Sequence, residues 1–290
     1  MSKESTLPVP VKKVAQSVVV HGFGRATSRL RALPNLLIAG GQRCGTTSMY
    51  RALSQHPLAF KPNLHKGVHY FDVSYDKGLS WYRGHFPWQS AVDKVAKEFG
   101  VTPAVFESSP YYGFHPLSAE RYAKDLPGVR LIVLIRDPIE RAYSAHAHEL
   151  ARGYETEPFE RALELEDSRL EGEEAKLVAD PAYLSHAHQH QAYVRRGQYV
   201  ENLERLAGVL GRDRIHIVDS ERFFSEPEAV FAGVTEFLGI PGVDGIAFER
   251  HNARPRSPMS DEVRSRLDAH FAPYNERLVE WLGWTPSWLH

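Results

Sequence analysis

The sequence of 290 residues has little of several features that would place it in a special class of protein. It holds one cysteine, Cys44, so no disulfide can form within the chain, as is typical of a reducing compartment. No apolar run approaches the roughly 18 residues of a transmembrane helix, and the first residues have no apolar centre like that of a signal peptide. We therefore expect a cytoplasmic protein.

Charge of one sign is not in excess either. The 35 Lys and Arg residues are balanced by 36 Asp and Glu residues. A chain this close to neutral has no overall field that attracts nucleic acid, so no nucleic-acid partner is expected and any anion site must be local. The hydrophobic share of 42% is enough for a sizeable globular core.

The chain divides into a short polar head and one longer body. Residues 1–33 are predicted to form an N-terminal tail or surface helix, and residues 34–290 one domain. The head contains several basic residues: Lys12, Lys13, Arg25, Arg29 and Arg31. Two interpretations of the head stay open, a solvated arm and a peripheral contact with an anionic membrane surface.

Within the body, short apolar runs alternate with helical patterns. LLIAG precedes a predicted helix over 46–55, AVFES a helix near 116–124, RLIVLIRD a helix over 138–150, and RIHIVDS a helix over 226–238. This alternation predicts an α/β fold, a single-domain parallel sheet flanked by helices. Ligands of such sheets bind beyond the carboxyl ends of the strands.

The first of these strand ends carries a glycine-containing turn, GGQRCGTT, over residues 40–47. The turn fits the G-x-x-x-x-G part of a P-loop, but it has Thr46 and Thr47 where a nucleoside triphosphate loop has Lys and Ser or Thr. Backbone amides and a helix start still favour an oxyanion, and Arg43 supplies a cation. The alternative is an ordinary glycine turn with a threonine cap.

A second strand end, in LIVLIRDPIERAYSAH, carries Arg136 where a nucleoside triphosphatase has its magnesium-binding aspartate. Pro138 suits a helix start, and Ser144 lies on the next turns of that helix. Arg136 is also compatible with a structural ion pair. Two anion sites on neighbouring strands indicate a nucleotide with phosphates at both ends of its ribose.

These motifs together resemble those of sulfotransferases that use 3′-phosphoadenosine 5′-phosphosulfate (PAPS). G-x-R-x-G-T-T-S and R-D-P-x-E-R-A-Y-S are similar to the family's 5′- and 3′-phosphate motifs. KGVHYFD and RRGQYVENL resemble stretches of the heparan-sulfate-type and related bacterial branch. The resemblance runs from about residue 35 to the C-terminus and implies the P-loop-like sulfotransferase fold.

The resemblance implies a set of donor-binding residues. Arg43 would contact the sulfuryl group and the oxygen that bridges to the 5′-phosphate. The loop around Cys44, with Gly45, Thr46, Thr47 and Ser48, would surround the 5′-phosphate. Arg136 and Ser144 would hold the 3′-phosphate, and Arg254 and Arg256, in a late basic segment, are weaker candidates.

The sequence departs from that branch at the general base. Gly67 stands where the family's K-E-x-H motif has its glutamate. If this stretch is extended, His69 lies on the same side as residue 67, and imidazole suits a base near neutral pH. We expect His69 to be the base, oriented by Asp72, with Lys66 adding charge. Glu107 is the second candidate and His65 the third, and a buried structural role for His69 stays open.

No metal site is expected, because His186, His188 and His190 lie two apart in a stretch that reads as helical, where they would scatter around the axis. The overall prediction is transfer of a sulfuryl group from PAPS to a hydroxyl of a carbohydrate or glycolipid, with adenosine 3′,5′-bisphosphate as the product. Alternatives are sulfation of a small aromatic or lipid alcohol, a P-loop kinase, and a non-catalytic nucleotide-binding relative.

Overall fold

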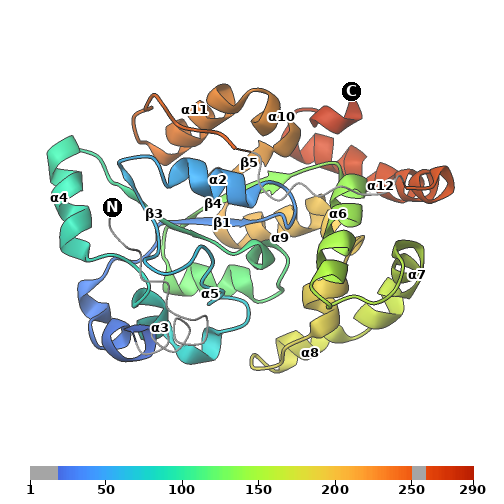
Figure 1. The fold of residues 1–290 in the computed structure, drawn as a ribbon, viewed down its shortest axis with the longest axis horizontal. Coiled ribbons are helices and arrows are strands. Elements are labelled where there is room, and N and C mark those ends of the chain that lie inside the picture. The colour runs from blue at the N-terminus through green and yellow to red at the C-terminus, as the bar shows by residue number, and fades with distance from the viewer. Residues whose placement is uncertain (1–18, 250–258) are drawn as a thin grey trace, which may run out of the picture.

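A computed structural model describes residues 19–249 and 259–290, and its centre is a five-stranded parallel sheet of order β2-β3-β1-β4-β5 (Figure 1). The strands are β1 (Leu36–Gly40), β2 (Ala59–Phe60), β3 (Ala104–Ser108), β4 (Arg130–Ile135) and β5 (Ile215–Asp219). The predicted α/β fold with a parallel sheet is confirmed, and the four predicted strands all form.

Continuous burial explains why the strand sequences are apolar runs without alternation. Each residue of β1 and β3 is buried, because helices cover both faces of the sheet. The register places Leu36 of β1 between Phe106 of β3 and Arg130 of β4. β1 therefore lies in the middle of the sheet, and the turn that follows it opens near the centre of the molecule.

The helices form layers on both sides of these strands. In Figure 1, α2, α10 and α11 lie above the strands, and α3 and α5 lie below them. The helices are α2 (Thr46–Leu53), α3 (Leu79–Arg83), α4 (Gln89–Phe99), α5 (Ser118–Asp125), α6 (Pro138–Ala151), α7 (Phe159–Leu170), α8 (Glu173–Ala179), α9 (Tyr199–Leu210), α10 (Ser220–Ser225), α11 (Pro227–Leu238) and α12 (Asp261–Leu282).

A helical lobe, which we define as α6, α7, α8 and the short turns η5 (Ala187–Gln191) and η6 (Arg195–Gly197), lies at one end of the molecule. It shares a small core with α12, in which Ala142, Phe159 and Phe271 are buried. Since α6 begins directly after β4, this lobe is joined to the carboxyl end of the sheet.

The described part of the N-terminal segment packs on the domain. Nη1 of Arg31 donates to the carbonyl oxygen of Phe86 at 2.8 Å, and the amide of Ala32 donates to the carbonyl oxygen of Pro87 at 2.9 Å. The boundary between residues 33 and 34 stays a prediction. Within the described ranges, no helix combines the length and apolarity needed to cross a membrane.

Candidate active site

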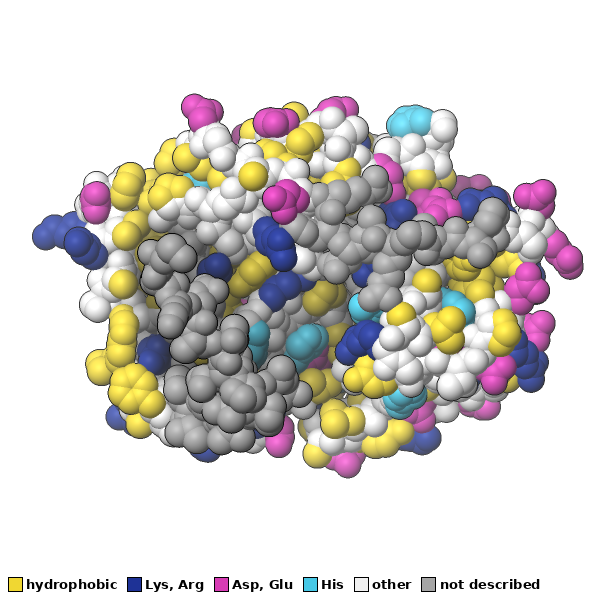
Figure 2. Space-filling model, viewed as in Figure 1, with side chains coloured by type: hydrophobic (Ala, Val, Ile, Leu, Met, Phe, Trp, Pro, Cys, Tyr) yellow, Lys and Arg dark blue, Asp and Glu magenta, His cyan; other side chains and the backbone are white. Residues whose placement is uncertain are grey.

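The carboxyl ends of β1, β3 and β4 bring the predicted site residues to one edge of the sheet, as parallel topology requires. The turn after β1 carries Arg43, the end of β3 carries Glu107, and Arg136 follows β4. On the face drawn in Figure 2, Lys, Arg and His side chains lie in a hollow near the middle, while most acidic side chains lie around the outline.

The anion loop, residues 40–47, turns sharply into α2. Gly45 caps the helix with a φ of 86°, a conformation that favours glycine, and Arg43 has a φ of 70°. A Cβ atom on Gly45 would lie 3.1 Å from the ring of Phe224. The loop therefore needs glycine at 45, and it tolerates a strained backbone at Arg43.

Lys66 reaches the start of α2 from the segment between β2 and α3. Its Nζ donates to Oγ1 of Thr47 at 3.0 Å and to Oγ1 of Thr46 at 3.3 Å. Burial lowers the pKa of Lys66 to about 8, although the charge of Glu107 acts in the opposite direction. The structure thus brings a partly desolvated cation to the two threonines of the loop.

Arg43 and Arg136 each have a protein partner. Nε of Arg43 donates to Oγ of Ser144 at 3.1 Å, and Nε of Arg136 lies 3.1 Å from Oε1 of Glu221. The sequence grouped Ser144 with Arg136, whereas the structure joins Ser144 to the anion loop. It also adds Glu221, which no motif indicated.

Cys44 belongs to the core below the loop. Its side chain is fully buried, its Sγ lies 3.6 Å from the hydroxyl of Tyr199, and its amide donates to the carbonyl oxygen of Gly41 at 3.1 Å. Burial raises the pKa of the Cys44 thiol to about 11. Ser48 is also buried, on the first turn of α2.

His69 and Asp72 form a close pair. Nδ1 of His69 lies 2.7 Å from Oδ2 of Asp72, whose side chain is fully buried, while the side chain of His69 is 40% exposed. If the proton is on Nδ1, Nε2 is left as an acceptor. Burial lowers the pKa of His69, but the charge and hydrogen bond of Asp72 outweigh it, so the pKa is raised overall.

The stretch around Gly67 is not a regular strand, because His69 has a φ of 54°. The premise of an extended segment is therefore wrong, yet the ring still faces residue 67. A Cβ atom built on Gly67 would lie 3.4 Å from Nε2 of His69 and 2.7 Å from the carbonyl oxygen of Ser108. The imidazole thus lies beside Gly67, the position at which the resembled K-E-x-H motif has its glutamate.

Glu107 is fully buried, and both its carboxylate oxygens accept hydrogen bonds. The donors are the hydroxyls of Tyr112, Tyr82 and Ser109 and the amide of Val68, at 2.6, 3.2, 2.7 and 3.1 Å. This arrangement suits a residue that anchors the segment before His69. His65, the third candidate, has Nδ1 2.9 Å from the carbonyl oxygen of Gly67.

The clustered histidines each contact a different protein group. His188 contacts the hydroxyl of Tyr111 at 2.7 Å, His190 the carboxylate of Glu149 at 3.0 Å, and His186 a carbonyl oxygen at 3.0 Å. As the sequence predicted, the stretch is helical, in η5. In the part of the chain that the structure describes, no group of three or more His, Cys, Asp or Glu could hold a metal ion. Arg254 and Arg256 lie outside the described residues.

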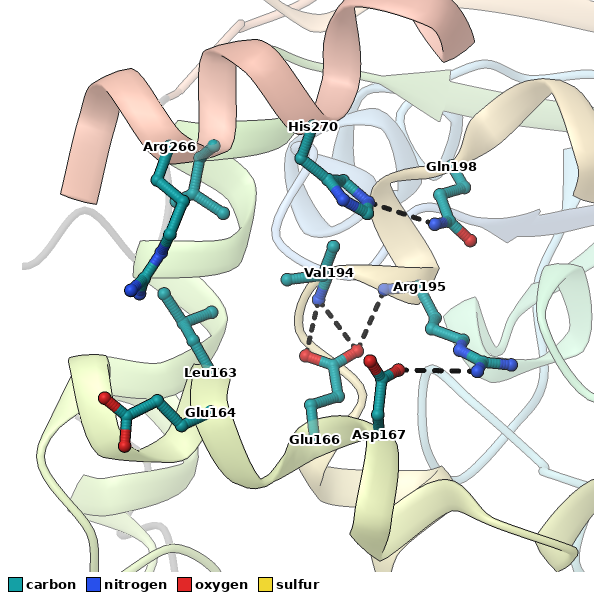
Figure 3. A pocket seen from close by; sticks show the side chains of 10 residues that line it. Leu163, Glu164, Glu166, Asp167, Val194, Arg195, Gln198, Arg266 and His270 are labelled. Atoms are coloured by element: carbon teal, nitrogen blue, oxygen red, sulfur yellow. Dashed lines mark hydrogen bonds and ion pairs between the residues drawn. The ribbon is translucent and has the colours of Figure 1, made fainter. Parts of the chain in front are cut away.

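A separate hollow of about 330 Å³ lies between the lobe and α12, where α7, η6 and the first turns of α12 meet (Figure 3). Glu166 lies at its base and accepts hydrogen bonds from the amides of Val194 and Arg195. Charges of both signs line the hollow, so it offers no concentrated field for an anion. The residue of interest here is Glu166, because its hydrogen bonds hold the start of the η6 turn in place.

The family model for the sulfotransferase domain matches residues 33–255. The chain belongs to the sulfotransferase family. This match covers the anion loop, the His69 segment and Arg136, and it identifies the chain as a sulfotransferase enzyme.

Known relatives agree with this assignment. The chain is 26% identical to membrane-associated sulfotransferase kil1 of Dictyostelium discoideum, over 90% of this chain and 67% of that protein. It is 25% identical to human heparan sulfate glucosamine 3-O-sulfotransferase 5, over 89% of this chain and 75% of that protein. It spans only 32% of the bifunctional heparan sulfate N-deacetylase/N-sulfotransferase 1 of Caenorhabditis briggsae, at 26% identity.

A solved structure supports the fold. The crystal structure of a sulfotransferase from Alicyclobacillus acidocaldarius matches with a TM-score of 0.64 and 27% identity, over 88% of this chain and 98% of that one.

One expectation is corrected by the comparisons. The cytoplasmic location is wrong as an expectation, because the relative from Dictyostelium discoideum is membrane-associated by name.

Proposed function

We propose that this sulfotransferase transfers a sulfuryl group from PAPS to a hydroxyl of a carbohydrate or glycolipid acceptor. The observation that carries the proposal is the presence of two separate cationic positions at neighbouring strand ends. One is the anion loop after β1, which carries Arg43 and which Lys66 contacts from the segment after β2. The other is Arg136, after the neighbouring strand β4. PAPS has anionic groups at its 5′ and 3′ positions, and the two cationic positions match that requirement.

In this proposal the anion loop binds the 5′ end of the donor. Amides at the start of α2, together with the hydroxyls of Thr46 and Thr47, would hold the 5′-phosphate. Arg43 and Lys66 would contact the sulfuryl group and the bridging oxygen. Lys66 supports this fit. Its Nζ is hydrogen-bonded to neutral hydroxyls, and burial lowers the pKa of its ammonium group. An anion that binds beside it would therefore stabilise the charged form of Lys66.

Arg136 and Ser144 are proposed to hold the 3′-phosphate. A guanidinium can bind two phosphate oxygens at once, and the pair of Arg136 with Glu221 uses Nε of the group. Arg254 and Arg256 stay predictions for the same nucleotide. The 3′-phosphate distinguishes PAPS from ATP, so Arg136 is the residue on which donor selectivity depends.

His69 is proposed as the general base of an in-line displacement. The acceptor oxygen forms a bond to sulfur, its proton moves to Nε2 of His69, and the bond from sulfur to the bridging oxygen breaks. Adenosine 3′,5′-bisphosphate leaves with the electron pair of that bond. Asp72 keeps the proton on Nδ1 of His69 and stabilises the imidazolium that forms. Positioning and charge neutralisation supply the rest, and this scheme requires no metal.

A saccharide acceptor is supported by the relatives, several of which are heparan sulfate sulfotransferases by name.

We also propose a peripheral contact with anionic membranes through the N-terminal segment. Arg25 and Arg29 are exposed there, next to Phe23 and Leu30, which are 57% and 63% exposed. Co-sedimentation with phosphatidylserine vesicles that is lost in Arg25→Ser/Arg29→Ser, and absent with phosphatidylcholine alone, would support this contact. Equal sedimentation of both proteins would contradict it.

Calorimetry tests the donor. We expect the wild type to bind adenosine 3′,5′-bisphosphate in preference to ADP with magnesium, and Arg136→Ala to bind it about 10- to 100-fold more weakly, the loss expected for a charged hydrogen bond. Arg277→Ala, which removes an arginine from a surface ion pair, is the matched control. Preference for ADP with magnesium would indicate a kinase instead, and bisphosphate binding without turnover on any saccharide or alcohol would indicate a non-catalytic relative.

A further inference from the structure

Both polar atoms of the Gln42 side-chain amide, inside the anion loop, are hydrogen-bonded. Its amide nitrogen donates to Oε1 of Glu149 at 2.8 Å, and its amide oxygen accepts from Nη1 of Arg196 at 2.8 Å. The motifs of the sequence assign this position no role. A carboxylate on one side and a guanidinium on the other determine which way the amide faces.

Glu149 is a rigid partner. Its side chain, on α6, is fully buried, and Oε2 lies 3.0 Å from Nδ1 of His190 and 3.7 Å from Nη1 of Arg152. Burial raises the pKa of Glu149, but the hydrogen bond and charge of His190 outweigh burial and lower the pKa overall. Glu149 is therefore an anion at neutral pH, and an amide donor suits it.

Arg196 is equally fixed. Its Nη2 donates to the carbonyl oxygens of His188 at 2.8 Å and Gln189 at 2.7 Å, and its guanidinium lies 4.9 Å from the ring centroids of Tyr111 and Phe114. Burial lowers the pKa of Arg196 to about 10, which leaves it charged at neutral pH. The amide oxygen of Gln42 thus accepts from a buried cation.

The η6 turn that carries Arg196 is held by α7, another element of the lobe. The carboxylate of Glu166, on α7, accepts hydrogen bonds from the amides of Val194 and Arg195, which Figure 3 draws as dashed lines. The two distances are 2.8 Å and 2.9 Å. A continuous set of part-buried hydrogen bonds therefore runs from α7 through η6 to the anion loop.

The same helix, α6, meets the loop at two points. Ser144 accepts from Nε of Arg43, and Glu149 accepts from the neighbouring Gln42. The backbone of Arg43 has a φ of 70°, a strained conformation that surrounding contacts must maintain. We infer that Gln42 is a positioning residue, through which the helical lobe sets the conformation of the loop that presents Arg43 to the donor. This inference rests on the proposed function, since it takes the loop to be the donor site.

An exchange of charge tests the inference. Gln42→Glu keeps the shape of the side chain but places a second carboxylate against Glu149, so we expect the dissociation constant for adenosine 3′,5′-bisphosphate to rise about tenfold or more. The double variant Gln42→Glu/Glu149→Gln restores one donor and one acceptor at that contact. We expect its affinity to return to within about threefold of the wild type.

Kinetics separate positioning from general destabilisation. In Gln42→Glu the KM for PAPS should rise while the KM for the acceptor and the melting temperature change little. Gln89→Glu is the matched control, because Gln89 also donates to a carboxylate, that of Asp93, on the exposed helix α4. It should bind the bisphosphate as the wild type does.

Any of four results would overturn the inference. Wild-type affinity in Gln42→Glu, or equal weakness in the single and double variants, would show that the pairing of Gln42 does not position the loop. If Gln42→Glu does not fold, the double variant alone decides. A double variant that folds but binds the bisphosphate weakly contradicts the inference. A double variant that folds and binds with wild-type affinity supports the pairing of Gln42 with Glu149. Failure of the wild type itself to bind the bisphosphate would instead remove the proposed function, and the inference with it.

Discussion

Nδ1 of His69 lies 2.7 Å from Oδ2 of Asp72, and the carboxylate of this pair is completely buried while the imidazole is partly exposed. This arrangement leaves Nε2 as the ring nitrogen beside Gly67. It also raises the pKa of His69 above its usual 6.5, because the charge and hydrogen bond of Asp72 more than offset burial. A base must be neutral to act, so kcat/KM for the acceptor should rise with pH through an apparent pKa above that value.

His69→Ala should lower kcat by about 100-fold or more, the usual contribution of a general base. Asp72→Asn removes the charge that raises the pKa of His69, so the acid limb of the pH profile should move to lower pH. Asp76→Asn, an exposed substitution of the same kind in η3 (Tyr75–Lys77), should leave the profile unchanged. A profile that does not move in Asp72→Asn would show that His69 does not act as the base.

Placing at position 67 the glutamate of the resembled K-E-x-H motif should not improve this enzyme. A Cβ atom there would lie 2.7 Å from the backbone oxygen of Ser108, which cannot move away easily. We expect Gly67→Glu to lose about 1–3 kcal/mol of unfolding free energy, as overpacking does, and to lower kcat. Thermal unfolding and initial rates check both.

Gly242→Glu is the matched control for that substitution. A Cβ atom on Gly242 meets no atom within 4 Å, so this variant should unfold at the wild-type temperature. A Gly67→Glu enzyme that is stable and faster than the wild type would mean that the site is still shaped for a carboxylate base.

Cys44 should be unreactive in the folded protein despite its place in the anion loop. Burial raises the pKa of its thiol to about 11, so only about a thousandth of it is thiolate at pH 8. We expect slow modification by a thiol-specific disulfide reagent in the native state and complete modification after unfolding. Rapid labelling that adenosine 3′,5′-bisphosphate prevents would place the thiol at the donor instead.

The sequence predicted the sheet well because β1, β3 and β4 are buried almost throughout and β5 is buried at three of its five residues, so that all four have mostly apolar sequences. It missed β2, since two residues, Ala59 and Phe60, are too short for any pattern. It also did not indicate α10, which lies between β5 and the predicted helix at 226–238.

The sequence predicted which types of residue form the site, but it did not predict which side chains contact one another there. Glycines, threonines and arginines after strands indicate anion binding locally, so the loop and Arg136 could be found. The link from Arg43 to Ser144, and the one from Gln42 to Glu149, join residues about a hundred positions apart. Such pairings depend on how α6 packs, and no local pattern encodes them. A polar Gln within an apolar-flanked loop was the only available signal.

Lys66 has a consequence for the heat of donor binding. Because its pKa is about 8 when its partners are two hydroxyls, about half of these side chains are neutral at pH 8. A dianion arriving beside it would raise that pKa, and the site would then draw a proton from the buffer. Binding enthalpy measured at pH 8 should differ between Tris and triethanolamine, two buffers without anionic groups whose ionisation heats differ, and the difference should disappear at pH 6.5 or in Lys66→Met. The enzyme would thus gain a proton on loading its donor, and alkaline conditions would weaken the donor complex.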